Sequence, residues 1–556
     1  MTSQSSRPSR ASRPGAVSPD KAARRTVAAI AAAALAAGTV IVPAAAQADP
    51  PAAPIPVYQD DSGAHSFAER AADLVSRMTL AEKITQFGAS TSSSGSAAVP
   101  RLGLKAYRYW NEALHGVARV GEATALPTGL GIASTWNRAL VTESLDAVAN
   151  EARAYYNSNP GGLGLTYWSP TINLDRDPRW GRVEEGYGED PYLTGQIAGA
   201  FVDGLQGDDA TYLKSVATVK HFAANNHENS RNSDSSDMDQ KTLREYYLPA
   251  FQNTVENHQV ASLMSAYNRV NGVPAPANAF LLTDVLRRTW GFDGFVTSDC
   301  GAIDDVGGAG HNWTPPGADH RVTRPEATAY SLRAGTDIDC SGSQYKANLG
   351  PAVEQGLLNE ADLDLALVRM YTVRMRTGEF DSADKNPWPA GEYSLANQRS
   401  APAHLALAET MSEEALVLLK NDPAHGQSNP ILPLTTADLG LVAVVGDLAN
   451  EFILGDYSPS PTTDGPDNAA DGVGNHPLKG IQDAVVALGG SPANVVHVGN
   501  NAYGTLTVAE ESLVQAASAV IVVVGTRKSD SSEGSDRSSL AMPRNQAGFV
   551  EAALAL

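Results

Sequence analysis

The chain has 556 residues, with 62 acidic against 41 basic side chains and a net charge of −21. This balance argues against binding to nucleic acid, because phosphate neutralisation needs clustered Lys and Arg. Its 42% hydrophobic and 19% charged residues are typical of a folded protein, and its length favours more than one domain. With two cysteines, Cys300 and Cys340, a disulfide-dense scaffold and a thiolate-rich zinc site are excluded.

Residues 1–48 are expected to be a secretory signal peptide. Basic residues dominate up to Arg25, the apolar run TVAAIAAAALAAGTVIV follows, and Ala46 and Ala48 fit an A-x-A cleavage site. The apolar run is shorter than the roughly 20 residues that span a bilayer. We therefore expect a secreted protein without membrane insertion after signal cleavage, in a compartment where a disulfide can form.

Residues 60–385 alternate short apolar runs with helical patterns, which is typical of repeated β-α units. An early helix is predicted in TLAEKITQF, where Thr79 and Glu82 make a capping box. Four apolar runs predict buried strands: LTYWSPTI, SVATV, ASLMSAY and GFVTS. The alternation predicts a TIM-like (β/α)8 barrel in this part of the chain.

Polar residues capable of chemistry follow the predicted strands. Lys220 and His221 come after the second, Tyr267 ends the third, and Asp299 comes after the fourth. Barrel enzymes keep their active sites at the carboxyl ends of the strands. These four residues are therefore expected at one active-site face.

A second domain follows a linker. Residues 386–402 are rich in Pro, Gly, Asn and Ser and predict that linker. In residues 403–556, HLALAETMSEEALVLL predicts an amphipathic helix, and LGLVAVVGD and AVIVVVG predict parallel strands covered on both faces. The expected fold is an open α/β sheet. Because the chain stops at Leu556 inside a helical pattern without a stop signal, we expect this domain to be incomplete.

Several motifs occur in a characteristic order: VSRMTLAEK, YWNEALHG, NLDRDPRWGRVEEGYGEDPYLTG, KHF, YNRVNG, GFVTSDCGAIDD and SSEGSDR. Together they resemble glycoside hydrolase family 3, in its secreted β-xylosidase and β-glucosidase branch. The resemblance implies a barrel followed by an α/β sandwich, with the active site between them. It also implies an exo-acting retaining β-glycosidase that removes non-reducing terminal sugars by double displacement.

Retaining cleavage of a glycosidic bond needs two carboxyl groups, a nucleophile and an acid/base, roughly 5–5.5 Å apart. The resemblance makes Asp299 the nucleophile, although an aspartate after a strand can also be a simple helix N-cap. It makes Glu533, in a Gly- and Ser-rich loop, the acid/base, with Asp530 as a nearby competitor. Burial is expected to raise the pKa of Glu533 when the two domains close over the sugar, as the proton-donor role requires.

The resemblance also implies a set of sugar-binding residues, with Tyr267 lying against the nucleophile: Glu112, Arg182, Lys220, His221 and Tyr267. Cys300 and Cys340, both at the rim of the expected site, are predicted to form a disulfide, with two free buried cysteines as the alternative. No metal or organic cofactor is implied. The His227-Glu228 pair is not a zinc site, because Arg231 stands where a metalloprotease has its second histidine. The expected partner is an oligosaccharide or glycoside, and the oligomeric state is left open.

Four hypotheses about the substrate and activity remain open. Glu112 and Cys300 resemble the xylosidase pattern, so β-D-xylosyl residues of xylo-oligosaccharides are the expected substrate, whereas KHFAANN is closer to the β-glucosidase branch. An N-acetylhexosaminidase would carry a Pro- and Gly-rich loop where FAANNHE stands. A catalytically impaired carbohydrate-binding protein is disfavoured, because both candidate carboxylates are in place.

Overall fold

The computed structural model describes residues 55–88, 95–423, 428–459, 476–499 and 503–556. The predicted signal peptide lies outside these residues. By their contacts, residues 57–556 form a single unit. Within the described ranges, no helix combines the length and apolarity that a membrane span requires. We call residues 57–414 the N-terminal part and residues 428–556 the C-terminal part.

A parallel four-stranded sheet forms the centre of the N-terminal part. Its order is β1-β2-β4-β7, and every one of its residues is buried, as expected for a parallel sheet covered on both faces. Isolated parallel bridges continue it, at Asn111–Tyr167 on one edge and Thr297–Ile338 on the other. The strands are β1 Thr166–Tyr167, β2 Val216–Phe222, β4 Ser262–Ser265 and β7 Phe295–Ser298.

These strands fall where the four apolar runs predict them. The second strand continues through Lys220 and His221, so these two residues lie within the strand, near its carboxyl end, and do not follow it. A smaller sheet of two-residue strands lies nearby in sequence: β3 Ser235–Ser236, β5 Arg269–Val270 and β6 Val273–Pro274.

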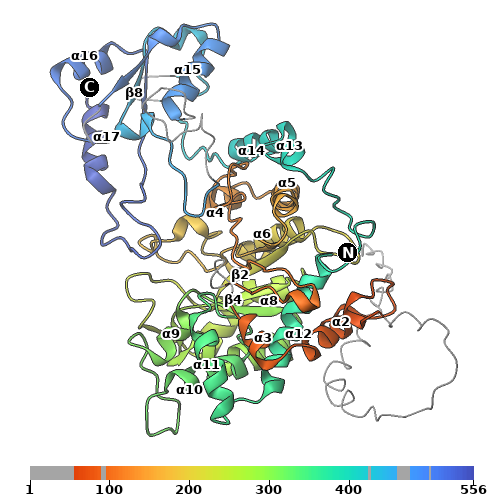
Figure 1. The fold of residues 1–556 in the computed structure, drawn as a ribbon. Helices are drawn as coiled ribbons and strands as arrows, with labels where there is room; N and C mark the ends of the chain where they lie inside the picture. The colour runs from red at the N-terminus through yellow and green to blue at the C-terminus, as the bar shows by residue number, and fades with distance from the viewer. Residues whose placement is uncertain (1–54, 89–94, 424–427, 460–475, 500–502) are drawn as a thin grey trace, which may run out of the picture. The chain divides into compact units, whose positions relative to one another are not determined.

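Helices of the N-terminal part pack around the sheet (Figure 1), and the buried apolar side chains of this part form two large clusters and a smaller one. The predicted capping box is confirmed, because Thr79 and Glu82 cap α3 reciprocally. The described α-helices of this part are α2 Phe67–Ser76, α3 Leu80–Thr85, α4 Gly129–Ser134, α5 Arg138–Ser158, α6 Pro191–Gln206, α7 Gln240–Thr242, α8 Pro249–Glu256, α9 Ala302–Gly307, α10 Arg324–Ala334, α11 Ser343–Glu354, α12 Glu360–Arg376, α13 Leu395–Gln398 and α14 Pro402–Glu414. Two segments form π-helices, Leu243–Tyr247 and Phe280–Thr289.

The structure corrects the sequence prediction around α14. This helix was expected in the second domain, but Ala408 and Met411 are buried in the same cluster as α5 of the N-terminal part. It also ends at Glu414, so the following ALVLL run is not helical, and Leu419 is 92% exposed. Ala408 and Met411 are three residues apart and therefore lie on one face of the helix. This apolar face packs on the N-terminal part.

The C-terminal part is an open α/β sheet, as the continuous β-branched runs predict. Its parallel strands lie in the order β10-β8-β9: β8 Val442–Val445, β9 Val495–Val498 and β10 Ala519–Val522. Alternate β8 residues point to opposite faces, with Val442 and Val444 packed against α15 Pro477–Ala487 and Ala443 and Val445 packed against α16 and α17. Figure 1 shows α15 and α16 on either side of β8. The last two helices are α16 Val508–Ala516 and α17 Gln546–Leu554.

Candidate active site

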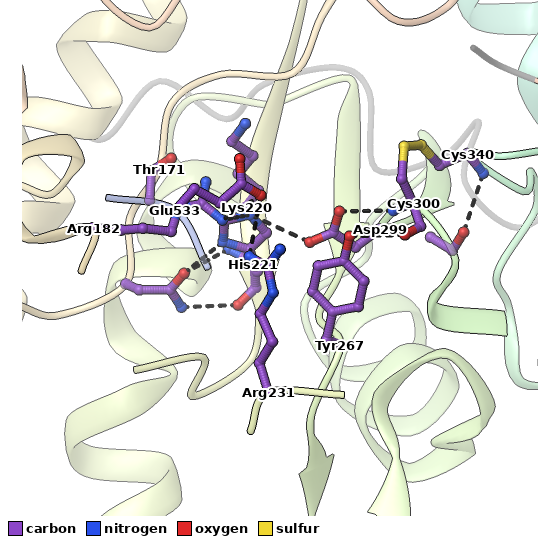
Figure 2. A network of polar contacts seen from close by, with 12 residues as sticks. Thr171, Arg182, Lys220, His221, Arg231, Tyr267, Asp299, Cys300, Cys340 and Glu533 are labelled. Carbon is purple, nitrogen blue, oxygen red and sulfur yellow. Dashed lines mark hydrogen bonds and ion pairs between the residues drawn. A yellow bond between two sulfur atoms is a disulfide. The ribbon is translucent and has the colours of Figure 1, made fainter. Parts of the chain in front are cut away.

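The carboxyl ends of β2, β4 and β7 bring the predicted site residues together (Figure 2). Lys220 and His221 lie at the end of β2, Tyr267 lies two residues beyond β4, and Asp299 directly follows β7. These strands are neighbours in the parallel sheet, so their ends share one edge. Glu533 reaches the same place from a loop of the C-terminal part.

Asp299 is a buried carboxylate with one oxygen free to react. Its Oδ1 accepts a hydrogen bond from the backbone N–H of Cys300 at 2.7 Å. Its Oδ2 is buried and has no hydrogen-bond partner among the described residues. Burial raises the pKa of this carboxyl, and the nearby Arg182 guanidinium opposes the rise. One bonded and one free oxygen give a carboxylate that is held in orientation and can still form a bond.

His221 is a neutral hydrogen-bonding group in this site. Burial, followed by the positive charge of Arg182, lowers its pKa well below the usual range. Its Nδ1 lies 2.9 Å from Asn173 Oδ1, which accepts a hydrogen bond, and its Nε2 lies 3.2 Å from Arg182 Nη1, which donates one. These partners assign the Nδ1–H tautomer. The 3.5 Å approach of Nε2 to Asp299 Oδ2 is therefore not an ion pair.

Glu112 and Lys220 form a buried ion pair beside this centre. Lys220 Nζ lies 3.2 Å from Glu112 Oε2, and Trp110 Nε1 donates to Glu112 Oε1 at 2.8 Å. Glu112 is 1% exposed, and burial raises its pKa against the opposing charge of Lys220. The Trp110 ring stacks on Trp168 with centroids 5.6 Å apart. Carboxylate, ammonium and indole groups thus present acceptors, donors and an apolar face in one place, which is the set of groups that a sugar contacts.

In the substrate-free structure the pKa of Glu533 is lowered and not raised. Burial acts to raise its pKa, but Arg182, the Tyr457 hydroxyl and Arg231 outweigh that effect and lower the pKa to about 2. Arg231 Nη1 lies 3.1 Å from Glu533 Oε1 and Arg182 Nη1 lies 3.7 Å from it, while the Tyr457 hydroxyl donates to Oε2. In the substrate-free site Glu533 is therefore ionised. Its competitor Asp530 accepts from Arg527 N–H and Arg544 within the C-terminal part.

Tyr267 acts on the backbone next to Asp299 and not on the Asp299 carboxylate. Its hydroxyl donates to the carbonyl oxygen of Cys300 at 2.8 Å, and the Arg231 guanidinium lies over its ring, 4.5 Å from the centroid. The structure also joins Cys300 and Cys340 in a disulfide, with their Cα atoms 4.7 Å apart. The residue after Asp299 is thus fixed through both its backbone and its side chain.

Comparison with known protein families identifies the chain. The family model for the glycosyl hydrolase family 3 N-terminal domain matches residues 97–373, and the model for the C-terminal domain of the same family matches residues 416–556. The chain belongs to glycoside hydrolase family 3.

Curated relatives of this family 3 chain carry xylosidase names. A protein of Aspergillus fumigatus named "Probable exo-1,4-beta-xylosidase bxlB" is 35% identical over 507 residues, covering 87% of this chain and 60% of the relative. "Beta-D-xylosidase 1" of Arabidopsis thaliana is 35% identical over 501 residues, covering 86% and 59%. The chain thus spans about 60% of the length of these relatives.

Solved structures of glycosidases share the fold. A "GH3 exo-beta-xylosidase (XlnD)" in complex with a xylobiose aziridine probe matches with a TM-score of 0.75 and 31% identity, over 89% of this chain and 61% of that one. A β-glucosidase from Erythrobacter marinus matches with a TM-score of 0.73 and 26% identity, over 90% and 71%. Xylosidases and glucosidases both occur among the similar structures.

Two residues of this family 3 site were missed in the sequence. Arg231 entered the sequence argument only as the residue that rules out a zinc motif, and Tyr457 lies in a loop after β8 that no periodic pattern marks. The KHF and SSEGSDR motifs locate the two sides of the site, but not the loops that cross between them. Within the described residues, no cluster of three or more His, Cys, Asp or Glu side chains is arranged to hold a metal ion.

Proposed function

We propose that the chain is an exo-acting retaining β-glycosidase that removes non-reducing terminal sugars from oligosaccharides or glycosides. The observation that carries the proposal is the free, buried Oδ2 of Asp299 in a site that also holds Glu533. In this mechanism Asp299 Oδ2 bonds to the anomeric carbon as the glycosidic bond breaks, and Glu533 gives a proton to the leaving oxygen. Glu533 then takes a proton from the water that releases the sugar.

The sugar-binding roles follow from the charges of the side chains. Lys220 and Arg182 donate to hydroxyl groups, Glu112 accepts from them, and neutral His221 adds a further polar contact. Hydroxyls that accept hydrogen bonds from Arg182 and Arg231 replace the contacts that these arginines make with Glu533. Weakening those contacts raises the pKa of Glu533 toward the range that proton donation requires.

We propose β-D-xylosyl residues as the terminal sugar. Two features support this choice: the buried Glu112, fixed by Trp110 and Lys220, and the xylosidase names of the curated relatives. A β-glucosidase is the second candidate, because β-glucosidases are among the similar structures. The comparison of kcat/KM for a β-xyloside and a β-glucoside with the same aryl group decides between them.

Two carboxylate variants test the mechanism. Asp299→Ala should lose activity on all substrates. Glu533→Ala should still form the glycosyl-enzyme from a 2,4-dinitrophenyl glycoside, which needs little proton donation, and added azide should accelerate its turnover. Proton NMR should show the β-anomer as the first product. Equal losses on activated and unactivated substrates in Glu533→Ala would move the acid role elsewhere, with Asp530→Ala as the next variant; an α-anomer first would contradict retention.

Two further parts of the proposal concern fold and export. We propose that the parallel strands of the N-terminal part belong to a TIM-like (β/α)8 barrel. The parallel bridges at both edges of the sheet support this, as does the parallel bridge Gly88–Asp339 next to the bridge at Ile338. An experimental structure with an open sheet would contradict this. We also propose that residues 1–48 direct secretion. Protein recovered from the medium should then begin at Asp49, and protein retained in the cell with Met1 intact would contradict it.

A further inference from the structure

We propose that Asp536 is a positioning residue that docks the loop carrying Glu533 onto the N-terminal part, and that this docking aims the proton donor. The inference rests on the proposed function, because it assigns a task only where Glu533 is the acid/base. Glu533 differs from Asp299 in its support: it stands on a loop between a strand and a helix, and not at the end of a buried strand. Something other than a strand must therefore hold it.

The Asp536 carboxylate accepts three backbone hydrogen bonds from two loops of the N-terminal part. Gly181 N–H donates to Oδ1 at 2.9 Å, and the N–H groups of Glu228 and Asn229 donate to Oδ2 at 2.8 and 3.0 Å. The Asp536 side chain is 8% exposed. Hydrogen bonds to an ionised acceptor are stronger than neutral ones, and three of them fix the carboxylate in both position and direction.

Two backbone N–H groups of the same loop return hydrogen bonds to one of these two loops, the one that carries Glu228 and Asn229. Gly534 N–H donates to Glu228 Oε2 at 2.9 Å, and Asp536 N–H donates to Asn229 Oδ1 at 3.2 Å. Glu228 is itself 3% exposed and accepts from Trp180 Nε1 at 2.9 Å. Glu533 thus directly precedes a docked residue, Gly534, and lies three positions from the docked carboxylate.

The approach of the two parts is close enough to require glycine. A Cβ placed on Gly181 would collide with the carbonyl oxygen of Ser532 and lie 2.5 Å from that of Ser535. These two residues flank Glu533 and Gly534 in the loop. A methyl group at position 181 would therefore push the loop away from the site without removing any polar group.

Docking of the loop fixes the position and direction of Glu533, which its contacts with the two arginines do not. Attraction to Arg231 and Arg182 acts over a range of orientations, whereas proton transfer needs the carboxyl within hydrogen-bond reach of the leaving oxygen. A docked loop sets that distance before the substrate arrives. Loss of docking should consequently slow the step that needs a proton far more than the step that needs only Asp299.

The test compares Asp536→Asn and Gly181→Ala in the chain as it stands, with Asp483→Asn as a control for loss of a carboxylate. Asp483 lies on α15, is 64% exposed and pairs with Lys479. Each variant is measured on xylobiose, a poor leaving group, and on 2,4-dinitrophenyl β-xyloside, a good one. We expect kcat on xylobiose to fall about 10- to 100-fold, part of the 10²- to 10⁴-fold that a positioned acid contributes, and kcat/KM on the aryl xyloside to fall less than about 3-fold.

The two variants remove docking in different ways, so Gly181→Ala tests the proposal even where Asp536→Asn folds poorly, and melting curves identify that case. The control should keep both rates within about twofold. Equal losses on the two substrates, or unchanged rates in both docking variants, would overturn the positioning role. An unmutated chain that hydrolyses neither the aryl xyloside nor the aryl glucoside would overturn the proposed function itself, which is a separate result.

Discussion

Replacing Arg231 by methionine is expected to move the pH profile of activity to higher pH. Arg231 Nη1 lies 3.1 Å from Glu533 Oε1, and its charge is among those that lower the pKa of Glu533 to about 2. The same charge opposes the burial that raises the pKa of Asp299. Removing a cation favours the protonated form of a nearby carboxyl, so both pKa values should rise. Methionine keeps an unbranched apolar chain over the Tyr267 ring.

The size of the shift follows from the remaining contacts. An opposite charge within hydrogen-bond distance typically moves a carboxyl pKa by about 1–3 units. Because Arg182, 3.7 Å from Glu533, remains in the variant, the lower end of this range applies. We expect the limb of the pH profile that belongs to Glu533 to move to higher pH by about 1 pH unit. Asp299 makes no hydrogen bond to Arg231 among the described contacts, and its limb should move in the same direction.

The assay is kcat/KM on xylobiose from about pH 1.5 to pH 9, because this parameter reports the pKa values of the free enzyme and the range must include the Glu533 pKa of about 2. The matched control is Arg179→Met, which removes an arginine from a nearby loop; its side chain is 48% exposed and pairs with Asp177. The control profile should stay in place. A profile of Arg231→Met that does not move, or that moves to lower pH, would refute the electrostatic reasoning for Glu533.

Three further outcomes are expected. The space near the Glu112 carboxylate should give a preference of about 10- to 200-fold in kcat/KM for β-xylosides over β-glucosides. Glu112→Asp should reduce this preference. An unchanged preference in the variant would contradict the role of Glu112. Cys340→Ala should lower the free energy of unfolding by about 4 kcal/mol, measured by urea titration, because the disulfide to Cys300 closes a loop of 40 residues. A loss below about 1 kcal/mol would mean that packing, and not the disulfide, holds the loop. Met411→Ala should lower the free energy of unfolding by about 2–5 kcal/mol, because this side chain is fully buried. Leu405→Ala, at a half-exposed position of the same helix, should change it by less than about 0.5 kcal/mol. Similar losses in the two variants would contradict the packing of α14 on α5.

The strand ends of the N-terminal part were predictable because two signals coincide there. Apolar runs locate the buried strands, and the polar residue at or just beyond the end of each run marks the carboxyl end of the strand, as with His221, Tyr267 and Asp299. The packing of α14 was not predictable in the same way. A periodic apolar face at Ala408 and Met411 shows that the helix must be covered, but not which surface covers it.

The ionisation of Glu533 was beyond the sequence for a different reason. Its pKa depends on three cations that are all distant from it along the chain: Arg182, Lys220 and Arg231. Burial alone predicts a raised pKa, and the sign reverses only when the fold places these charges around one carboxylate. Asp536 was hidden in the same way, since a loop aspartate shows no sign of the two distant loops that donate to it.

An acid/base residue must give up a proton in the first step and take one in the second, so its pKa should change during the reaction cycle. In the empty site the arginines hold Glu533 ionised, and a bound sugar that accepts hydrogen bonds from them favours the protonated form. Once Asp299 has formed its bond to the sugar it carries no charge, and the loss of a neighbouring negative charge lowers the pKa of Glu533 again. That is the direction a base needs in the second step. The excess of cations around Glu533 is therefore consistent with its second role, and substrate contacts with Arg182 and Arg231 supply the first.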